Sequence, residues 1–152
     1  MALIRLRAGE WLALAGGAAV VASLFLPWYG ARAREATVSG FEAFAVIDLL
    51  LVLLSLLAIA LAVLQATQIN PTLPVGASVV TTAFGLVSVL LVLFRIVDQP
   101  GPDAFIEVQR GAWVGLAATL ATAAGGWLSM ATEHVRGLPP GPDPELRPTP
   151  AA

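Results

Sequence analysis

Two ionisable residues stand inside long apolar segments and are the first candidates for chemistry. Asp48 is the third residue of the apolar stretch Val46–Leu64, and Arg95 lies near the end of the apolar stretch 75–97. A charge deep in a bilayer costs roughly 2.5–3.5 kcal/mol on insertion scales, so such residues are functional candidates by default. A turn near Asn70 places both residues within about one helical turn of the same depth. We interpret them as a structural ion pair, because a guanidinium–carboxylate pair offsets much of that cost.

Two rival interpretations remain for these charges. The Arg95 side chain could instead reach the lipid headgroups, and the Asp48 carboxylate could bind a solute. Additive effects of Asp48→Asn and Arg95→Gln on stability would exclude the pair.

The other reactive residue types form no recognisable catalytic or metal site. His134, the only histidine, has one acidic neighbour and no second ligand at a useful spacing. Three acids lie between helices, at Asp98, Asp103 and Glu107, and a solvated loop is the simpler interpretation. The chain has no cysteine, nucleophile elbow, phosphate-binding loop or dinucleotide motif. We therefore expect no enzymatic activity, no metal and no cofactor.

The composition is that of a membrane protein. Of 152 residues, 58% are hydrophobic and 12% are charged, whereas a soluble domain has roughly a quarter charged residues. The formal net charge is -2 and the sequence holds no basic cluster, which excludes nucleic acid as a partner. The expected surroundings are a lipid bilayer.

Four apolar segments are long enough to cross a bilayer, which takes roughly 20 residues per helix. We predict an all-α membrane protein, an antiparallel four-helix transmembrane bundle with short loops, occupying residues 1–136. Its helices are expected at about 9–29, 40–66, 74–97 and 111–132. The proline-rich segment 137–152 is predicted to be a disordered tail.

An alternative takes the first apolar segment as a cleaved signal peptide, because Arg5 and Arg7 precede it and Ala31-Arg32-Ala33 follows it. The apolar run exceeds the ~7–15 residues of such a segment. Its removal would leave three spans, one of them with an unpartnered face of small residues.

The connections between the spans carry local signals. Ser39 and Glu42 form a capping box that should begin the second helix. The connection between the third and fourth helices has room for a short surface helix around 104–109. The segment 29–40 is judged too short for an extracellular sheet, which argues against a claudin-like protein.

Small residues recur at steps of three and four along the predicted helices, as expected where helix backbones approach closely in a membrane. The "GAWVG" segment has the G-x-x-x-G spacing. Aromatic residues near the helix ends are predicted to anchor the membrane interfaces. The predicted packing residues are Gly16, Ser55, Thr81, Gly85, Ser88, Gly111, Gly115, Thr122 and Gly125, and the predicted anchors are Trp11, Trp28, Tyr29, Trp113 and Trp127.

Arginines flanking the spans give a weak orientation signal. With the N-terminus inside, four arginines (Arg5, Arg7, Arg136, Arg147) face the cytoplasm and three (Arg32, Arg34, Arg110) face outward. This balance favours cytoplasmic N- and C-termini in a multi-pass protein of the cell membrane.

The motifs "LPWY", "SGFEAF" and "RGAWVGL" are arranged along residues 5–130 in a way that resembles small four-span membrane proteins of unassigned function from GC-rich bacteria. The resemblance implies the fold and nothing about mechanism. From the residues we expect a non-catalytic accessory, scaffolding or assembly protein, with a membrane-protein partner or a second copy of itself. The alternative is an oligomeric transport or channel subunit whose path uses Asp48, Arg95, Ser88 and Thr122.

Overall fold

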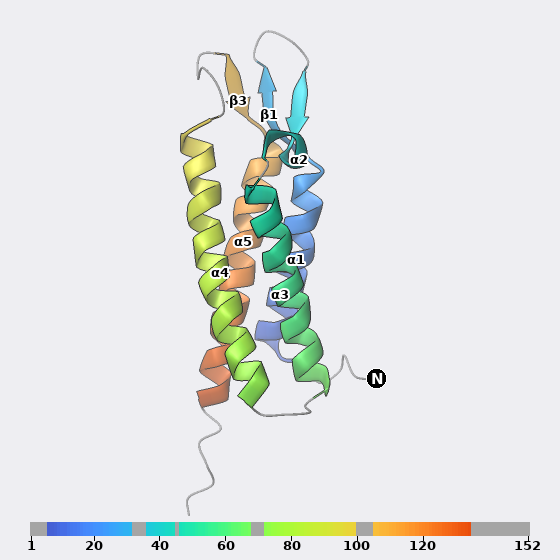
Figure 1. The fold of residues 1–152 in the computed structure, drawn as a ribbon, viewed down its shortest axis with the longest axis vertical. Coiled ribbons are helices and arrows are strands. Elements are labelled where there is room, and N and C mark those ends of the chain that lie inside the picture. The colour runs from blue at the N-terminus through green and yellow to red at the C-terminus, as the bar shows by residue number, and fades with distance from the viewer. Residues whose placement is uncertain (1–5, 32–35, 45, 68–71, 100–104, 135–152) are drawn as a thin grey trace, which may run out of the picture.

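The computed structural model describes residues 6–31, 36–44, 46–67, 72–99 and 105–134. These residues are mostly helical, and four long helices lie side by side (Figure 1). α1 and α5 pack against each other, α4 also packs on α5, and α3 lies against both α1 and α4. The four helices are α1 (Ala8–Leu24), α3 (Ile47–Thr67), α4 (Thr72–Val97) and α5 (Arg110–His134).

Three of these helices are long and apolar enough to span a membrane. The qualifying segments of the described chain are Ile47–Leu64 in α3, Gly76–Val97 in α4 and Arg110–Ala131 in α5. α1 is also apolar, but at 17 residues it is shorter than the other three. The membrane class predicted from composition therefore agrees with the length and apolar character of these helices.

A small antiparallel sheet lies at one end of the long helices (Figure 1). Its strands are β1 (Pro27–Ala31), β2 (Thr37–Ser39) and β3 (Ile106–Val108), in the order β2-β1-β3. Tyr29 stands opposite Val38 on one side and Val108 on the other. The pairing of β1 with β2 shifts register between Pro27 and Tyr29.

This sheet corrects three expectations. The first helix ends at Leu24 rather than at residue 29, because Pro27 cannot donate a helical hydrogen bond and disfavours the helical conformation at Leu26. The segment 104–109 contains strand β3 in place of a short helix. The segment 29–40 was judged too short for a sheet, but a sheet forms there because the distant connection between α4 and α5 supplies its third strand, β3.

The second predicted helix is divided into two. The capping box is confirmed: the Ser39 amide donates to the Glu42 carboxylate over 2.9 Å. It begins only the short helix α2 (Gly40–Ala43), however, and Phe44 is extended at φ -123° and ψ 140°. The Phe44 ring meets Trp28 and Tyr29 edge to face, at 5.0 and 6.0 Å between ring centroids.

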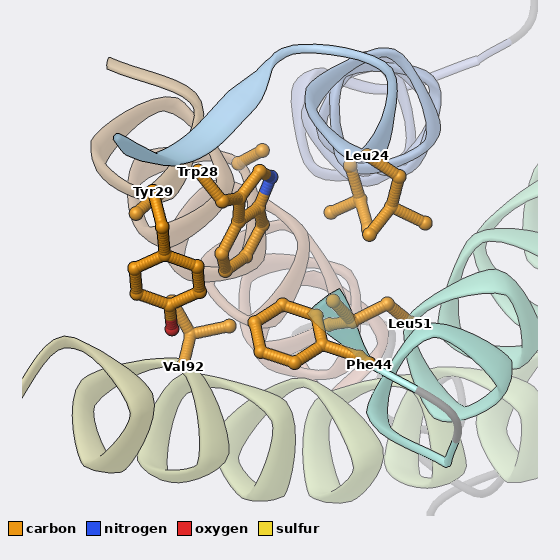
Figure 2. Packing of buried hydrophobic residues seen from close by; sticks show 9 residues of the cluster. Leu24, Trp28, Tyr29, Phe44, Leu51 and Val92 are labelled. Carbon is orange, nitrogen blue, oxygen red and sulfur yellow. The ribbon is translucent and has the colours of Figure 1, made fainter. Parts of the chain in front are cut away.

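The main apolar cluster lies next to the sheet, where β1, α2 and the ends of the long helices converge. Figure 2 shows Leu24, Trp28, Tyr29, Phe44 and Leu51 gathered there, with Val92 of α4 beneath them. All of them are buried. The predicted tail 137–152 lies outside the described residues.

Candidate functional site

Trp28 is buried inside the end of the bundle. Its indole points inward from β1 (Figure 2) and is 0% exposed. The indole Nε1 donates a 2.7 Å hydrogen bond to the main-chain oxygen of Ser23. This carbonyl lies in the last turn of α1, where the regular helical bonds end, and it also accepts a 3.1 Å hydrogen bond from the amide of Leu26. Trp28 therefore caps α1 and is not an exposed interface anchor, which corrects its predicted role.

Two glycines of the G-x-x-x-G motif make room for this indole. A Cβ atom on Gly111 would lie 2.8 Å from Cδ1 of Trp28, and one on Gly115 would lie 2.6 Å from Cζ2. A Cβ atom on Gly40 of α2 would lie 2.9 Å from Nε1 of the same indole. The motif was predicted to bring two helices together; in the structure it receives an aromatic side chain from β1, and a Cβ atom on Gly115 would also lie 3.2 Å from the Ser23 hydroxyl oxygen of α1.

Tyr29 caps a second helix. Its hydroxyl donates a 2.9 Å hydrogen bond to the main-chain oxygen of Arg95, in the last turn of α4. Tyr29 is 3% exposed, so it is not an exposed interface anchor either. Burial raises the pKa of the Tyr29 phenol to about 12, and the charge of Asp98 also raises it, while the Arg95 charge opposes both.

The structure does not bring Asp48 and Arg95 together as the predicted ion pair. Asp48 Oδ1 accepts a 2.7 Å hydrogen bond from the amide of Leu49 at the start of α3. The guanidinium carbon of Arg95 lies 5.4 Å from the centre of the Phe44 ring, and its Nε atom is buried without a hydrogen-bond partner. The break at Phe44 explains the difference, because it places an aromatic ring against the Arg95 side chain.

Small residues fill the seam between α1 and α5. A Cβ atom on Gly16 would lie 2.6 Å from Oγ1 of Thr122, and one on Gly9 would lie 2.8 Å from the main-chain nitrogen of Ser129. Gly125 lies against Gly9 in the same seam. Between α4 and α5, a Cβ atom on Gly85 would lie 2.8 Å from the Cα atom of Ala123, so both seams bring backbones into contact.

Most buried hydroxyl groups bond within their own helix. The Ser55 hydroxyl donates to the oxygen of Leu51 over 3.0 Å, and the Thr122 hydroxyl donates to the oxygen of Ala118 over 2.9 Å. Ser88 and Thr81 are also buried, and the Thr81 oxygen has no hydrogen-bond partner. Hydroxyl groups that bond to their own helix make no hydrogen bond to a neighbouring helix, and they contribute to the helix contacts through their small size.

The remaining tryptophans lie on the outside. Trp11, Trp113 and Trp127 are all exposed, as lipid-facing side chains would be. Phe25 and Phe41 are exposed near the sheet and meet edge to face at 5.0 Å between ring centroids.

Glu10 is a buried acid to which the sequence patterns assigned no role. It lies in the first turn of α1, is 1% exposed, and accepts a 2.6 Å hydrogen bond from the amide of Arg7. An acid favours this position because the first amides of a helix lack partners. This preference for an acid in the first turn of a helix is the sequence signal that could have identified Glu10.

The other candidate ligands remain scattered. In the described part of the chain, no group of three or more His, Cys, Asp or Glu residues is placed to hold a metal ion. Asp103 lies outside the described residues, and Glu107 is exposed on β3.

No protein-family model matches the chain, and neither a curated protein nor a solved structure matches it.

Proposed function

We propose that the chain is a non-catalytic integral membrane protein that acts as an accessory, scaffolding or assembly partner within the bilayer. The observation that supports this most directly is the tight seam between α1 and α5. A Cβ atom on Gly16 would overlap Thr122, at 2.6 Å from its hydroxyl oxygen. Helices held this closely leave no room along the seam for a substrate, and they form a rigid body suited to packing against another protein.

We also propose that four helices cross the bilayer as an antiparallel bundle, with α1 added to the three longer candidates. The 17 residues of α1 extend about 25 Å, slightly less than the ~30 Å hydrocarbon core. Exposed Phe25 and Leu26 continue its apolar surface. Gly9 lies against Ser129 while Gly16 lies against Thr122, so α1 and α5 run in opposite directions along a shared seam.

The proposed orientation puts both termini in the cytoplasm and the sheet outside the cell membrane, as the arginine balance favours. The proposed relatives are small four-span bacterial membrane proteins. Under this orientation, exposed Trp113 lies near the outer surface and exposed Trp11 and Trp127 near the inner surface, where aromatic belts form.

Transport by an oligomer is the second candidate function. Two polar atoms favour it: the Thr81 hydroxyl oxygen and the Arg95 Nε are buried without hydrogen-bond partners. Unpartnered polar groups in a membrane protein are costly and mark candidate paths. The Thr122 hydroxyl, another group on such a path, is already bonded to its own helix.

The two functions differ in what they predict for the purified protein. Extraction from the native membrane in a mild detergent, followed by native mass spectrometry, should yield the chain with a defined heterologous membrane protein. Reconstitution of the purified chain alone in liposomes should give no ion flux above that of empty liposomes. A homo-oligomer that conducts ions, with the flux lost in Thr81→Val, would replace the accessory function by transport.

A further inference from the structure

A pocket of 390 Å³ lies between the sheet and α2, apart from the tightly packed helices. Its lining comes from β1, β2, β3 and α2, and includes Tyr29, Val38, Ala43 and Ile106. Its volume falls within the range of about 300–1,000 Å³ typical of small-molecule sites. Because most of the lining is apolar, the pocket favours an apolar ligand body.

Among the residues that the structure describes, one carboxylate lines this apolar pocket, that of Glu42 in α2. The Ser39 amide and hydroxyl both donate to its Oε2 atom, at 2.9 and 2.8 Å, and Oε1 takes part in neither bond. These bonds, the amide first, lower the pKa of Glu42. The capping box therefore fixes an ionised carboxylate at the pocket while one of its oxygens takes part in neither capping bond.

We propose that this pocket binds a small amphipathic organic cation, with its apolar body between the sheet and α2 and its ammonium group on Oε1 of Glu42. An ammonium group supplies the hydrogen-bond donors and the positive charge that a free carboxylate oxygen accepts. This binding site is independent of the accessory function and does not require it.

The charge preference needs a direct comparison, because Arg32 and Arg34 occupy the connection between β1 and β2. A pair of probes provides it: hexylamine and hexanoic acid, each carrying a photoreactive diazirine on the far end of its chain. Both have the same apolar body and differ in the sign of the head group. The protein is held in an uncharged maltoside detergent, which does not compete for the carboxylate.

Illumination followed by peptide mass spectrometry locates the cross-links. We expect the amine probe to label residues 27–43 at least fivefold more than the acid probe does, while both probes label the exposed face of α3 equally. Equal labelling of residues 27–43 by both probes would show that the probes enter the pocket through their apolar bodies alone, with no preference for a cation. Stronger labelling by the acid probe would show that the pocket prefers anions, as expected if Arg32 and Arg34 determine its charge. Either result overturns the proposal.

Matched variants identify the carboxylate responsible. Glu42→Gln keeps a side-chain acceptor for the capping box but removes the charge, so amine labelling should fall to the level of the acid probe. Glu107→Gln, at an exposed position on β3 outside the pocket lining, should leave it unchanged. Ala31→Leu narrows the pocket and should lower amine labelling with Glu42 intact. Unchanged labelling in Glu42→Gln would contradict the assignment.

Discussion

The hydroxyl of Tyr29 donates a 2.9 Å hydrogen bond to the main-chain oxygen of Arg95, across 66 residues of sequence. That oxygen lies in the last turn of α4, where carbonyl groups have no regular helical partner. The adjacent residue of β1, Trp28, donates a 2.7 Å hydrogen bond to the main-chain oxygen of Ser23 in the last turn of α1, which also accepts from the amide of Leu26. Two consecutive residues of one strand thus complete the ends of two helices, and the sheet and the helices stabilise each other.

Removal of the Tyr29 hydroxyl should destabilise the protein. Tyr29→Phe leaves the part-buried carbonyl oxygen of Arg95 without this donor, and the loss of such a hydrogen bond costs about 0.5–1.5 kcal/mol of unfolding free energy. Equilibrium unfolding in detergent measures this loss. Trp113→Phe, an aromatic change at an exposed position, is the control and should cost less. Equal losses in the two variants would show that the hydrogen bond does not secure α4.

The same phenol makes stability depend on pH at the alkaline end. Burial raises its pKa to about 12, against about 10 in an unfolded chain. Because the folded state holds the proton more tightly, the contribution to stability is complete below pH 10 and is lost as the pH rises from 10 to 12. Tyr29 is the only tyrosine, so its ultraviolet absorbance reports the titration directly. A midpoint near 10 in the folded protein would contradict its burial.

Substitution within the G-x-x-x-G motif should act through Trp28. Gly115→Ala places a Cβ atom 2.6 Å from Cζ2 of the indole, and such overpacking costs typically about 1–3 kcal/mol. Gly76→Ala is the matched control in another helix, because nothing lies within 4 Å of its added atom. Thermal unfolding in detergent should show a loss for Gly115→Ala alone, together with a change in the fluorescence of Trp28. A stabilised Gly115→Ala protein would exclude the close contact.

Arg95 should be coupled to Phe44 rather than to Asp48. The guanidinium lies 5.4 Å from the Phe44 ring centre, and a cation–π contact is worth about 0.5–1 kcal/mol at exposed sites and more when desolvated. In double-mutant cycles, Arg95→Gln and Phe44→Leu should lose less together than their sum. Arg95→Gln and Asp48→Asn should add within about 0.3–0.5 kcal/mol. A large coupling energy between Arg95→Gln and Asp48→Asn would instead support the predicted ion pair of Arg95 and Asp48.

The long apolar helices could be predicted from sequence because their signal is local. Length and hydrophobicity alone define the segments around Ile47–Leu64 and Gly76–Val97. The capping box of Ser39 and Glu42 was equally readable, since it depends on two residues three positions apart. The small residues of α1 and α5 also lie where their spacing predicted a close seam.

The sheet could not be predicted in the same way, because its strands belong to different connections. β3 is three residues long and pairs with β1 from more than 70 positions away, so no local periodicity marks it. The roles of Trp28 and Tyr29 depend on this pairing. An aromatic residue at the end of an apolar segment has the same sequence signature whether it faces lipid or caps a neighbouring helix.

In the proposed topology four helices cross the membrane, α1 among them, with the sheet on the outer side. The absence of cysteine permits a direct measurement with single cysteines at Leu3, Thr37, Asn70 and Glu107 and a membrane-impermeant maleimide on intact cells. Thr37→Cys and Glu107→Cys should label, whereas Leu3→Cys and Asn70→Cys should label only after permeabilisation. The opposite labelling pattern at all four positions would mean that the orientation is inverted, while the four spans remain. Labelling of Leu3→Cys together with Thr37→Cys, on the side opposite Asn70→Cys, would show that α1 does not cross and would contradict the account.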